Sequence, residues 1–373
     1  MSRVAGEKTI AVTRGADSLL ADGDVPGVPE LSALLSDLLG GNNDAVSRIQ
    51  CERLPSRHGR VFRLRSAASS PFRTLIAKRL EPDIARKVEL LVKQWLPRAG
   101  LADCGPNLLG VAAARGGECT WHVYEDLGDC SLDPGATDRG RVAAAVSLIA
   151  AVHARFAASP LVAEWRLHGG DLGIHFFTSN VRDAIRALES LRPPGVEPSR
   201  DGCDLRDGLL ERMRALLRSV RWRTEALADL AGPETLLHGD LWPTNTFVLP
   251  AGPGRHARLI DWDHAGAGPF SYDLSTFLMR FPASDRRWIL EVYGAERNAA
   301  GWPLPSAEDC NVLFETAEYS RLANLIIWPA LALWKECAEW GFEMLEDING
   351  WFEEYEPVIP EKEETPRGRQ VSR

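Results

Sequence analysis

Two short apolar runs joined by a turn, within residues 246–260, constrain the local fold more than any other feature of this chain. Residues 246–249 and 258–260 have strand-like composition, and residues 250–254, with sequence PAGPG, separate them. Pro and Gly at these positions are typical of a tight turn between antiparallel strands. The pattern therefore predicts a β-hairpin, which returns the chain to the place where the first strand begins.

Oxygen-bearing side chains stand at both ends of this predicted hairpin. Asp240 and Asn245 precede it, and Asp261 and Asp263 follow it. Mg²⁺ prefers carboxylate and amide oxygens and keeps several waters, so it needs few protein ligands. Because a hairpin folds its two ends together, we expect Asn245 and Asp261 to converge on one ion. Asp263 reaches a second ion if the strand continues, which the sequence leaves open.

A second polar residue stands out on an apolar strand. Lys78 lies in the run LIAKRL at 75–80. A lysine in such a place is costly unless its ammonium group has a partner. The sequence therefore predicts a partner or a ligand for Lys78.

The patterns along the chain predict two regions of different structure. The first contains strand patterns at 61–65, 75–80 and 121–124, with a helical pattern at 84–96. After it, helical patterns dominate, at 138–156, 180–191, 205–220, 223–231 and 306–354. We expect a flexible N-terminus at 1–28, a first lobe at 29–127, a helical lobe at 128–357 and a disordered tail at 358–373.

Charge and cysteine usage restrict the class of protein. The net charge of −9 argues against nonspecific binding of nucleic acid or anionic membranes. Seven scattered cysteines without a CxxC pair indicate reduced thiols. The longest apolar run, 325–334, contains Pro329 and is too short to span a bilayer. We expect a soluble cytoplasmic protein.

Four segments carry a resemblance to a known family. They are HGDLWPTN at 238–245, LIDWDHAGAGPFSYDL at 259–274, LIAKRL at 75–80 and VYEDLG at 123–128. Taken in their order along the chain, these segments resemble the aminoglycoside phosphotransferase and choline kinase-like family. The resemblance implies an α+β, bilobal protein-kinase-like fold. Its N-terminal lobe would be a small antiparallel sheet with one helix, and its C-terminal lobe larger and mainly helical.

The same resemblance implies a role for each residue of the predicted cluster. Asp240 would be the catalytic base, and Asn245 and Asp261 would bind Mg²⁺. Lys78 would hold the phosphates of ATP or GTP, which is the phosphoryl donor. A glutamate on the following helix would pair with this lysine, and Glu89 is the best candidate.

Further parts of the nucleotide site follow from the resemblance. The backbone of a hinge-like segment would meet the nucleobase; its residues are Tyr124, Glu125, Asp126 and Leu127. The loop between the first strands has a single glycine, so phosphate contacts from Ser56 or Arg57 stay open. Asp273 and His153 match positions that we interpret as structural, and we interpret His238 as a hydrogen-bonding residue that shapes the loop.

The acceptor is less constrained than the reaction. The short stretch from Asp261 to Asp273 has no Ala-Pro-Glu segment after it, which excludes peptide docking and favours a small molecule. Carboxylates and tryptophans after residue 306 slightly favour a cationic acceptor such as an aminoglycoside antibiotic. These side chains are Glu308, Asp309, Glu315, Glu318, Trp328, Trp334, Glu336, Glu339, Trp340, Glu343, Glu346 and Asp347. A metabolic kinase for choline, homoserine, a sugar or a ketosamine is the alternative, and a catalytically silent nucleotide-binding regulator is a further one.

Overall fold

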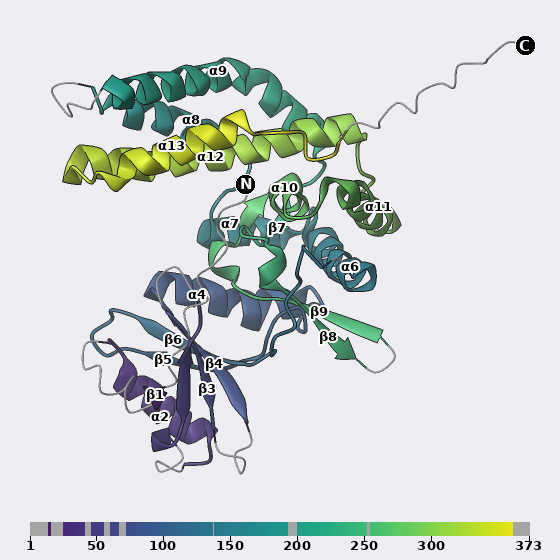
Figure 1. The fold of residues 1–373 in the computed structure, drawn as a ribbon. Helices are drawn as coiled ribbons and strands as arrows, with labels where there is room; N and C mark the ends of the chain where they lie inside the picture. The colour runs from purple at the N-terminus through teal and green to yellow at the C-terminus, as the bar shows by residue number, and fades with distance from the viewer. Residues whose placement is uncertain are drawn as a thin grey trace, which may run out of the picture.

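The structure, a computed structural model, has two lobes joined by the chain after the last strand of a sheet (Figure 1). It describes residues 14–15, 25–41, 46–55, 60–66, 72–136, 138–192, 200–251 and 254–360. Ser56 and Arg57 lie outside the described residues, as do 361–373 of the predicted tail. The predicted α+β, bilobal protein-kinase-like fold is confirmed.

The N-terminal lobe is built on an antiparallel sheet with the strand order β1-β2-β3-β4-β6-β5. Its strands are β1 (Arg14–Gly15), β2 (Gln50–Arg53), β3 (Val61–Arg65), β4 (Thr74–Leu80), β5 (Leu108–Ala113) and β6 (Thr120–Glu125). The strands predicted at 61–65, 75–80 and 121–124 are confirmed within one residue. Strand β5 is not predicted by the sequence, because its run LLGVAA lacks alternation of apolar and polar residues.

The two faces of this sheet differ because side chains alternate along each strand. On β4, Leu75 and Ala77 point into the core of the lobe, whereas Lys78 points to the opposite face, toward the C-terminal lobe. Helix α2 (Val28–Leu38) packs on the core face through Leu31 and Leu35. Its start lies one residue inside the predicted flexible N-terminus.

Helix α4 (Pro82–Leu90) connects the lobes. It continues through a wider turn at Leu91–Trp95 into α5 (Leu96–Arg98), which together cover the helix predicted at 84–96. Leu91 and Trp95 are buried, as the apolar spacing predicts. Lys87 also lies on α4. Its Nζ donates to the backbone oxygen of Asp263 at 2.6 Å, and this bond ties α4 to the C-terminal lobe.

The C-terminal lobe is mainly helical, as predicted. Its helices are α6 (Arg139–Phe156), α7 (Pro160–Gly169), α8 (Ile174–Glu189), α9 (Arg200–Leu230), α10 (Ser271–Met279), α11 (Ala283–Ala299), α12 (Ala307–Glu336) and α13 (Trp340–Glu353). The two helices predicted at 205–220 and 223–231 are one continuous helix, α9, because no glycine or proline lies between them. Helices α8, α9, α12 and α13 form a bundle at the end of the molecule far from the sheet (Figure 1).

The predicted hairpin is present between the two lobes. Strand β8 (Thr246–Ala251) pairs antiparallel with β9 (Gly254–Leu259), and Thr246 lies opposite Leu259. A second short pair, β7 (Thr235–Leu237) with β10 (Gly266–Gly268), lies next to it in the chain. Segment 238–245 connects β7 to β8, and segment 260–265 connects β9 to β10. Because β7 pairs with β10 and β8 pairs with β9, the two segments are held side by side.

The end of the helical lobe differs from the prediction. Val358 and Ile359, which the sequence analysis assigned to the disordered tail, are buried in the core. The backbone N–H of Ile359 donates to Asn311 at 2.9 Å, and two apolar side chains were too weak a signal to find this segment. No single helix of the described ranges is long and apolar enough to cross a membrane. Helices α6 and α7 reach that length only as a pair bent by 104°.

Candidate functional site

The loop 238–245 begins with a turn that only glycine fits. Gly239 has a φ of 82°, and a Cβ added there would lie 1.9 Å from the backbone oxygen of His264. L-residues rarely adopt this φ, and a backbone atom cannot move aside as a flexible side chain can. The close approach of 239 to 264 is therefore built into the sequence, and it brings the loop against the segment after β9.

A buried carboxylate holds this turn in place. Asp273 on α10 accepts the backbone N–H of His238 at 2.6 Å and that of Gly239 at 2.9 Å. His153 on α6 lies 3.3 Å from the same carboxylate and bonds to the hydroxyl of Tyr293. Burial alone would raise the pKa of Asp273, but the bonds from its partners hold it below its ordinary value. The structural interpretation of Asp273 and His153 is confirmed.

His238 shapes the loop, as predicted. Its Nε2 donates to the backbone oxygen of Ile260 at 2.7 Å, and its ring lies against Trp262 with centroids 4.7 Å apart. The histidine thereby joins the loop to the residue that precedes Asp261. Its Nε2 is occupied by this bond, and its Nδ1 lies 3.4 Å from the backbone nitrogen of Asp240.

The carboxylate of Asp240 has its two oxygens turned in different directions. Oδ1 accepts the indole Nε1 of Trp242 at 2.6 Å. Oδ2 lies 3.5 Å from Nδ2 of Asn245, which also donates to the backbone oxygen of Asp240 at 2.9 Å. Asp240 is half-buried, so its position is fixed while one side remains accessible. We refer to these sides as the metal flank, toward Asn245, and the tryptophan flank, toward Trp242.

The backbone around Asp261 places this residue beside Asn245 on the metal flank. It has φ 66° and ψ 55°, a left-handed conformation that is uncommon outside glycine and often marks functional positions. The preceding residue, Ile260, donates its N–H to the backbone oxygen of Asn245 at 2.9 Å. Asn245 and Asp261 therefore lie side by side at the two ends of the hairpin, as the sequence predicts.

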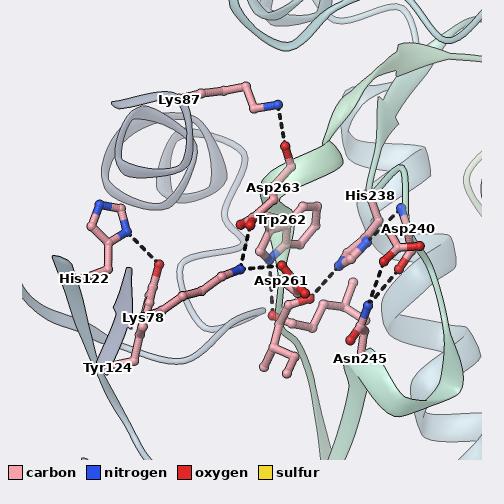
Figure 2. Close-up of polar contacts among 12 residues, drawn as sticks. Lys78, Lys87, His122, Tyr124, His238, Asp240, Asn245, Asp261, Trp262 and Asp263 are labelled. Carbon is pink, nitrogen blue, oxygen red and sulfur yellow. Dashed lines mark hydrogen bonds and ion pairs between the residues drawn. The ribbon is translucent and has the colours of Figure 1, made fainter. Parts of the chain in front are cut away.

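Lys78 reaches across from the N-terminal lobe to this flank (Figure 2). Its Nζ lies 2.5 Å from Oδ1 of Asp261 and 2.7 Å from Oδ2 of Asp263. Burial alone would lower the pKa of Lys78, but the two carboxylates raise it above its ordinary value. Burial alone would raise the pKa of Asp261, but the neighbouring Lys78 holds this pKa below its ordinary value. The pKa of Asp263 is raised by burial and by the neighbouring charge of Asp261. The flank is a compact arrangement of one cation between two carboxylates.

The metal flank fits Mg²⁺. Nδ2 of Asn245 is engaged with Asp240, so its amide oxygen is directed elsewhere, and the Asp261 side chain is 38% exposed. One amide and one carboxylate oxygen, completed by waters and phosphates, suit this ion. The described residues contain no group of three or more His, Cys, Asp or Glu placed to hold a metal. A site here would depend on the carboxamide of Asn245.

The predicted pairing of Lys78 with Glu89 is not present. Glu89 instead pairs with Lys93, one turn along the helix, at 2.7 Å. Lys78 pairs with Asp261 at 2.5 Å and with Asp263 at 2.7 Å. The i,i+4 spacing of Glu89 and Lys93 favours this local pair.

The hinge-like segment begins at the end of β6, on the strand that pairs with the strand of Lys78. The hydroxyl of Tyr124 lies 2.9 Å from Nδ1 of His122, close to Lys78, and burial raises its pKa. The Glu125 side chain accepts the backbone N–H of Asn107, and Asp126 pairs with Arg63 at 2.9 Å. Leu127 lies after the strand, in the chain between the lobes. The side chains of Glu125 and Asp126 are thus engaged in holding the segment in place.

The acidic side chains predicted to line an acceptor pocket do not form one cluster. Glu315 pairs with Arg223 at 2.7 Å, and Glu318 pairs with Arg321 at 2.5 Å. The members toward the end of α12 and on α13 are exposed; they are Glu336, Glu339, Glu343, Glu346 and Asp347. Trp328, Trp334 and Trp340 are exposed as well. The carboxylates near the site are neutralised by arginines that the sequence analysis did not consider.

Three cations near the site were missed. Lys87 anchors the helix of the N-terminal lobe to residue 263, and Arg280 and Arg321 lie beyond the tryptophan flank. Lys87 is recognisable as a lysine on the apolar side of an amphipathic helix. For the two arginines no local pattern exists, because they come from separate helices.

Comparisons with known proteins agree with this geometry. The sequence profile of the phosphotransferase enzyme family (APH) matches residues 57–306. No curated protein sequence matches the chain at a significant level.

Three solved structures are similar in fold. An ethanolamine kinase from Plasmodium vivax is 12% identical with a TM-score of 0.56, covering 90% of this chain and 92% of its own. APH(2″)-IIia, in complex with GDP and kanamycin, is 14% identical with a TM-score of 0.53, covering 86% and 98%. The spectinomycin phosphotransferase APH(9)-Ia, with ADP and spectinomycin, is 11% identical with a TM-score of 0.50, covering 83% and 90%.

At these identities the solved structures show the fold alone, whereas the family profile covers more than half of the chain. The profile includes Lys78, the loop 238–245 and both aspartates of the metal flank. The chain belongs to the phosphotransferase enzyme family and is a phosphotransferase that acts on small-molecule hydroxyls.

Proposed function

We propose that this enzyme transfers the γ-phosphoryl group of ATP or GTP to a hydroxyl of a small molecule, with Asp240 as the base. The observation that carries this proposal is the pair of directions in which the Asp240 oxygens point. Oδ2 faces Asn245 on the metal flank, and the carboxylate is held by a loop that Asp273 braces from behind. A half-buried carboxylate that is fixed beside a metal-binding flank can accept a proton from a hydroxyl as it attacks.

The transfer exchanges two bonds to phosphorus. The acceptor oxygen bonds to the γ-phosphorus, and the bond from that phosphorus to the bridging oxygen breaks, which releases the nucleoside diphosphate. The hydroxyl proton goes to Asp240. A bound Mg²⁺ supplies charge neutralisation on the phosphates; Asn245 and Asp261 are the residues that would hold it, with Asp263 beside them. Lys78 contributes the cation on this flank, from the opposite lobe.

The donor and the location are parts of the same proposal. One similar solved structure holds ADP and another holds GDP. We infer that the backbone of 124–127 binds the nucleobase, since the side chains of Glu125 and Asp126 are engaged elsewhere. All seven cysteines are free, which supports a cytoplasmic location. Calorimetric titration of ATP and of GTP, each with Mg²⁺, identifies the donor.

The substitution Asp240→Asn tests the assignment of the base. The carboxamide keeps the size of the side chain but cannot take a proton, so kcat should fall by on the order of 10²–10⁴ while the fold is retained. The measurement is coupled nucleotide turnover, with circular dichroism as the check on folding. Asp183→Asn on α8, far from the cleft, is the matched control. A turnover of Asp240→Asn close to that of the wild type would assign the base to another residue.

A further inference from the structure

An arginine stands on the tryptophan flank of Asp240. Arg280 directly follows α10, and its Cζ lies 3.5 Å from the ring centroid of Trp242. The Nε1 of the same indole bonds to Oδ1 of Asp240 at 2.6 Å. The guanidinium group and the base are therefore held by one aromatic side chain, and the metal ligand Asn245 lies on the other side of the base.

A second arginine supports this position from α12. The Cζ of Arg321 lies 3.7 Å from the ring centroid of Tyr272, and its Nη1 donates to Glu318 at 2.5 Å and to Ser275 at 3.1 Å. Another nitrogen donates to the backbone oxygen of Tyr272. Arg321 is thus fully engaged, and its charge is balanced by one carboxylate.

Arg280 differs from Arg321 because it has no partner of its own. Its Nε is buried without a hydrogen-bond partner, and within the described ranges no carboxylate lies within ion-pair distance of it. Burial lowers the pKa of Arg280; Glu318 and Asp240 oppose this shift, and Arg321 adds to it. A partly buried, unpaired cation is unfavourable unless an anion completes its surroundings. Glu318 is paired with Arg321, so the charge of Arg280 on this flank has no carboxylate partner among the described residues.

The surface next to these arginines is apolar. Leu325 and Trp328 follow Arg321 by one and two turns of α12, so the three residues share a face of the helix. Leu325 is 38% exposed and Trp328 is 66% exposed. A molecule beside Asp240 would meet guanidinium groups at one end and an apolar surface further along the helix.

We propose that Arg280, positioned by Trp242 and supported by Arg321, binds a carboxylate or phosphate group that the acceptor carries besides its reacting hydroxyl. The planar guanidinium group matches either anion through two parallel hydrogen bonds. Leu325 and Trp328 contact the apolar part of the acceptor. This inference rests on the proposed function and adds no chemical step to it. It replaces the cationic acceptor that the sequence favours.

Another anion could be the target of Arg280, namely the phosphoryl group during its transfer. The geometry favours the acceptor, because Arg280 and the metal ligands lie on opposite sides of Asp240. The two roles differ in measurable ways. A residue that binds the acceptor's anion changes selectivity among acceptors, whereas one that stabilises the transferred group slows every reaction, including hydrolysis of the nucleotide by water.

The experiment compares matched acceptors with the wild-type enzyme and Arg280→Gln. The acceptors are hydroxy acids of three to six carbons beside their carboxamides, and phosphate monoesters of diols beside the free diols. Turnover is measured by release of the nucleoside diphosphate. Binding is measured by calorimetry with protein loaded with Mg²⁺ and a non-hydrolysable nucleotide, so that the γ-phosphate position is filled. Arg139→Gln is the matched control, because Arg139 lies over Trp288 at 5.0 Å on the surface, away from the cleft.

We expect the wild-type enzyme to prefer the anionic member of a pair by tenfold or more in kcat/KM, and Arg280→Gln to reduce that preference by about tenfold to a hundredfold. The acid and phosphate series distinguish the two anions. Equal use of the charged and neutral members, preference for amino sugars, or no binding of any anion to the loaded protein would overturn the proposal. So would an equal fall in turnover of all acceptors and in hydrolysis. A wild-type enzyme that neither binds nor hydrolyses the nucleotide would instead contradict the proposed function.

Discussion

The two flanks of Asp240 are built from similar charged groups but are balanced differently. On the metal flank, the cation of Lys78 lies between the carboxylates of Asp261 and Asp263 at 2.5 and 2.7 Å. On the tryptophan flank, Arg321 pairs with Glu318 at 2.5 Å, whereas Arg280 lies over Trp242 and has no carboxylate partner among the described residues. The first flank has an excess of negative charge and the second an excess of positive charge. Each therefore suits a ligand of opposite sign, a metal ion on one side and an anion on the other.

The two flanks also differ in the roles that we propose for them. The metal flank lies within the family match, as do Trp242 and Arg280, whereas Glu318 and Arg321 lie beyond it; we propose that the metal flank serves the phosphates, which every donor carries. We propose that the tryptophan flank serves the acceptor, and the small molecules named for solved structures of similar fold differ: ethanolamine, kanamycin and spectinomycin. Substitutions on the two flanks should therefore affect different substrates.

The largest effect should come from the metal flank, through Asp261→Asn. Loss of this carboxylate removes roughly several kcal/mol of metal-dependent stabilisation, which corresponds to a fall in affinity for the Mg²⁺–nucleotide complex on the order of 10²–10³-fold. Calorimetric titration of the nucleotide with and without Mg²⁺ measures it. The preference between charged and neutral acceptors should stay as in the wild type. Unchanged nucleotide affinity would remove Asp261 from the metal site, and a changed acceptor preference would show that the flanks are not independent.

The metal flank could be predicted from the sequence because its geometry is local. A tight turn of Pro and Gly predicts the hairpin, and a hairpin necessarily brings Asn245 next to Asp261. The signal for Lys78 is also local, because it is a charged residue within the apolar strand 75–80. Its partner was predicted wrongly, because the distance between a strand and the next helix depends on how the lobes pack. Glu89 found a partner in its own helix instead.

The tryptophan flank could not be predicted, because its residues are brought together only by helix packing. Arg280 follows α10, Arg321 lies in α12 and Trp242 lies in the loop, and no spacing rule relates the three. The sequence after residue 306 showed many carboxylates, and it favoured a cationic acceptor for that reason. Glu315 and Glu318 are in fact paired with arginines from distant segments. A count of charges along a helix does not show which of them remain unpaired.

The next effect concerns the protonation of His122, which lies beside the metal flank on the neighbouring strand. It is fully buried opposite Lys78 in the sheet, and burial, with Lys78 and Lys93 adding to it, lowers its pKa to about 4. In the unfolded chain a histidine has a pKa near 6.5, so below that pH the unfolded state binds a proton that the folded state refuses. Stability is therefore lost as the pH falls from about 6.5 toward 4.

Between pH 7 and pH 5 this loss amounts to about 2 kcal/mol from His122 alone. His122→Gln should remove that part, so the free energy of unfolding of the variant should depend less steeply on pH than that of the wild type. Urea unfolding at several pH values measures both proteins, and the other titrating groups are common to them. Parallel curves would mean that His122 takes up its proton in the folded state, and that the metal flank tolerates a further cation.

The smallest effect should come from Glu318→Gln on the tryptophan flank. The carboxamide can still accept from Ser275, but it no longer balances Arg321, so the excess positive charge of the flank increases. We expect a loss of about 1 kcal/mol in the free energy of unfolding, because a charged hydrogen bond between partly buried groups is weakened. Binding of a hydroxy acid should become a few-fold tighter, whereas binding of the nucleotide should not change. Weaker binding of the acid would mean that Glu318 acts by positioning the arginines, and that charge excess is not what attracts the acceptor.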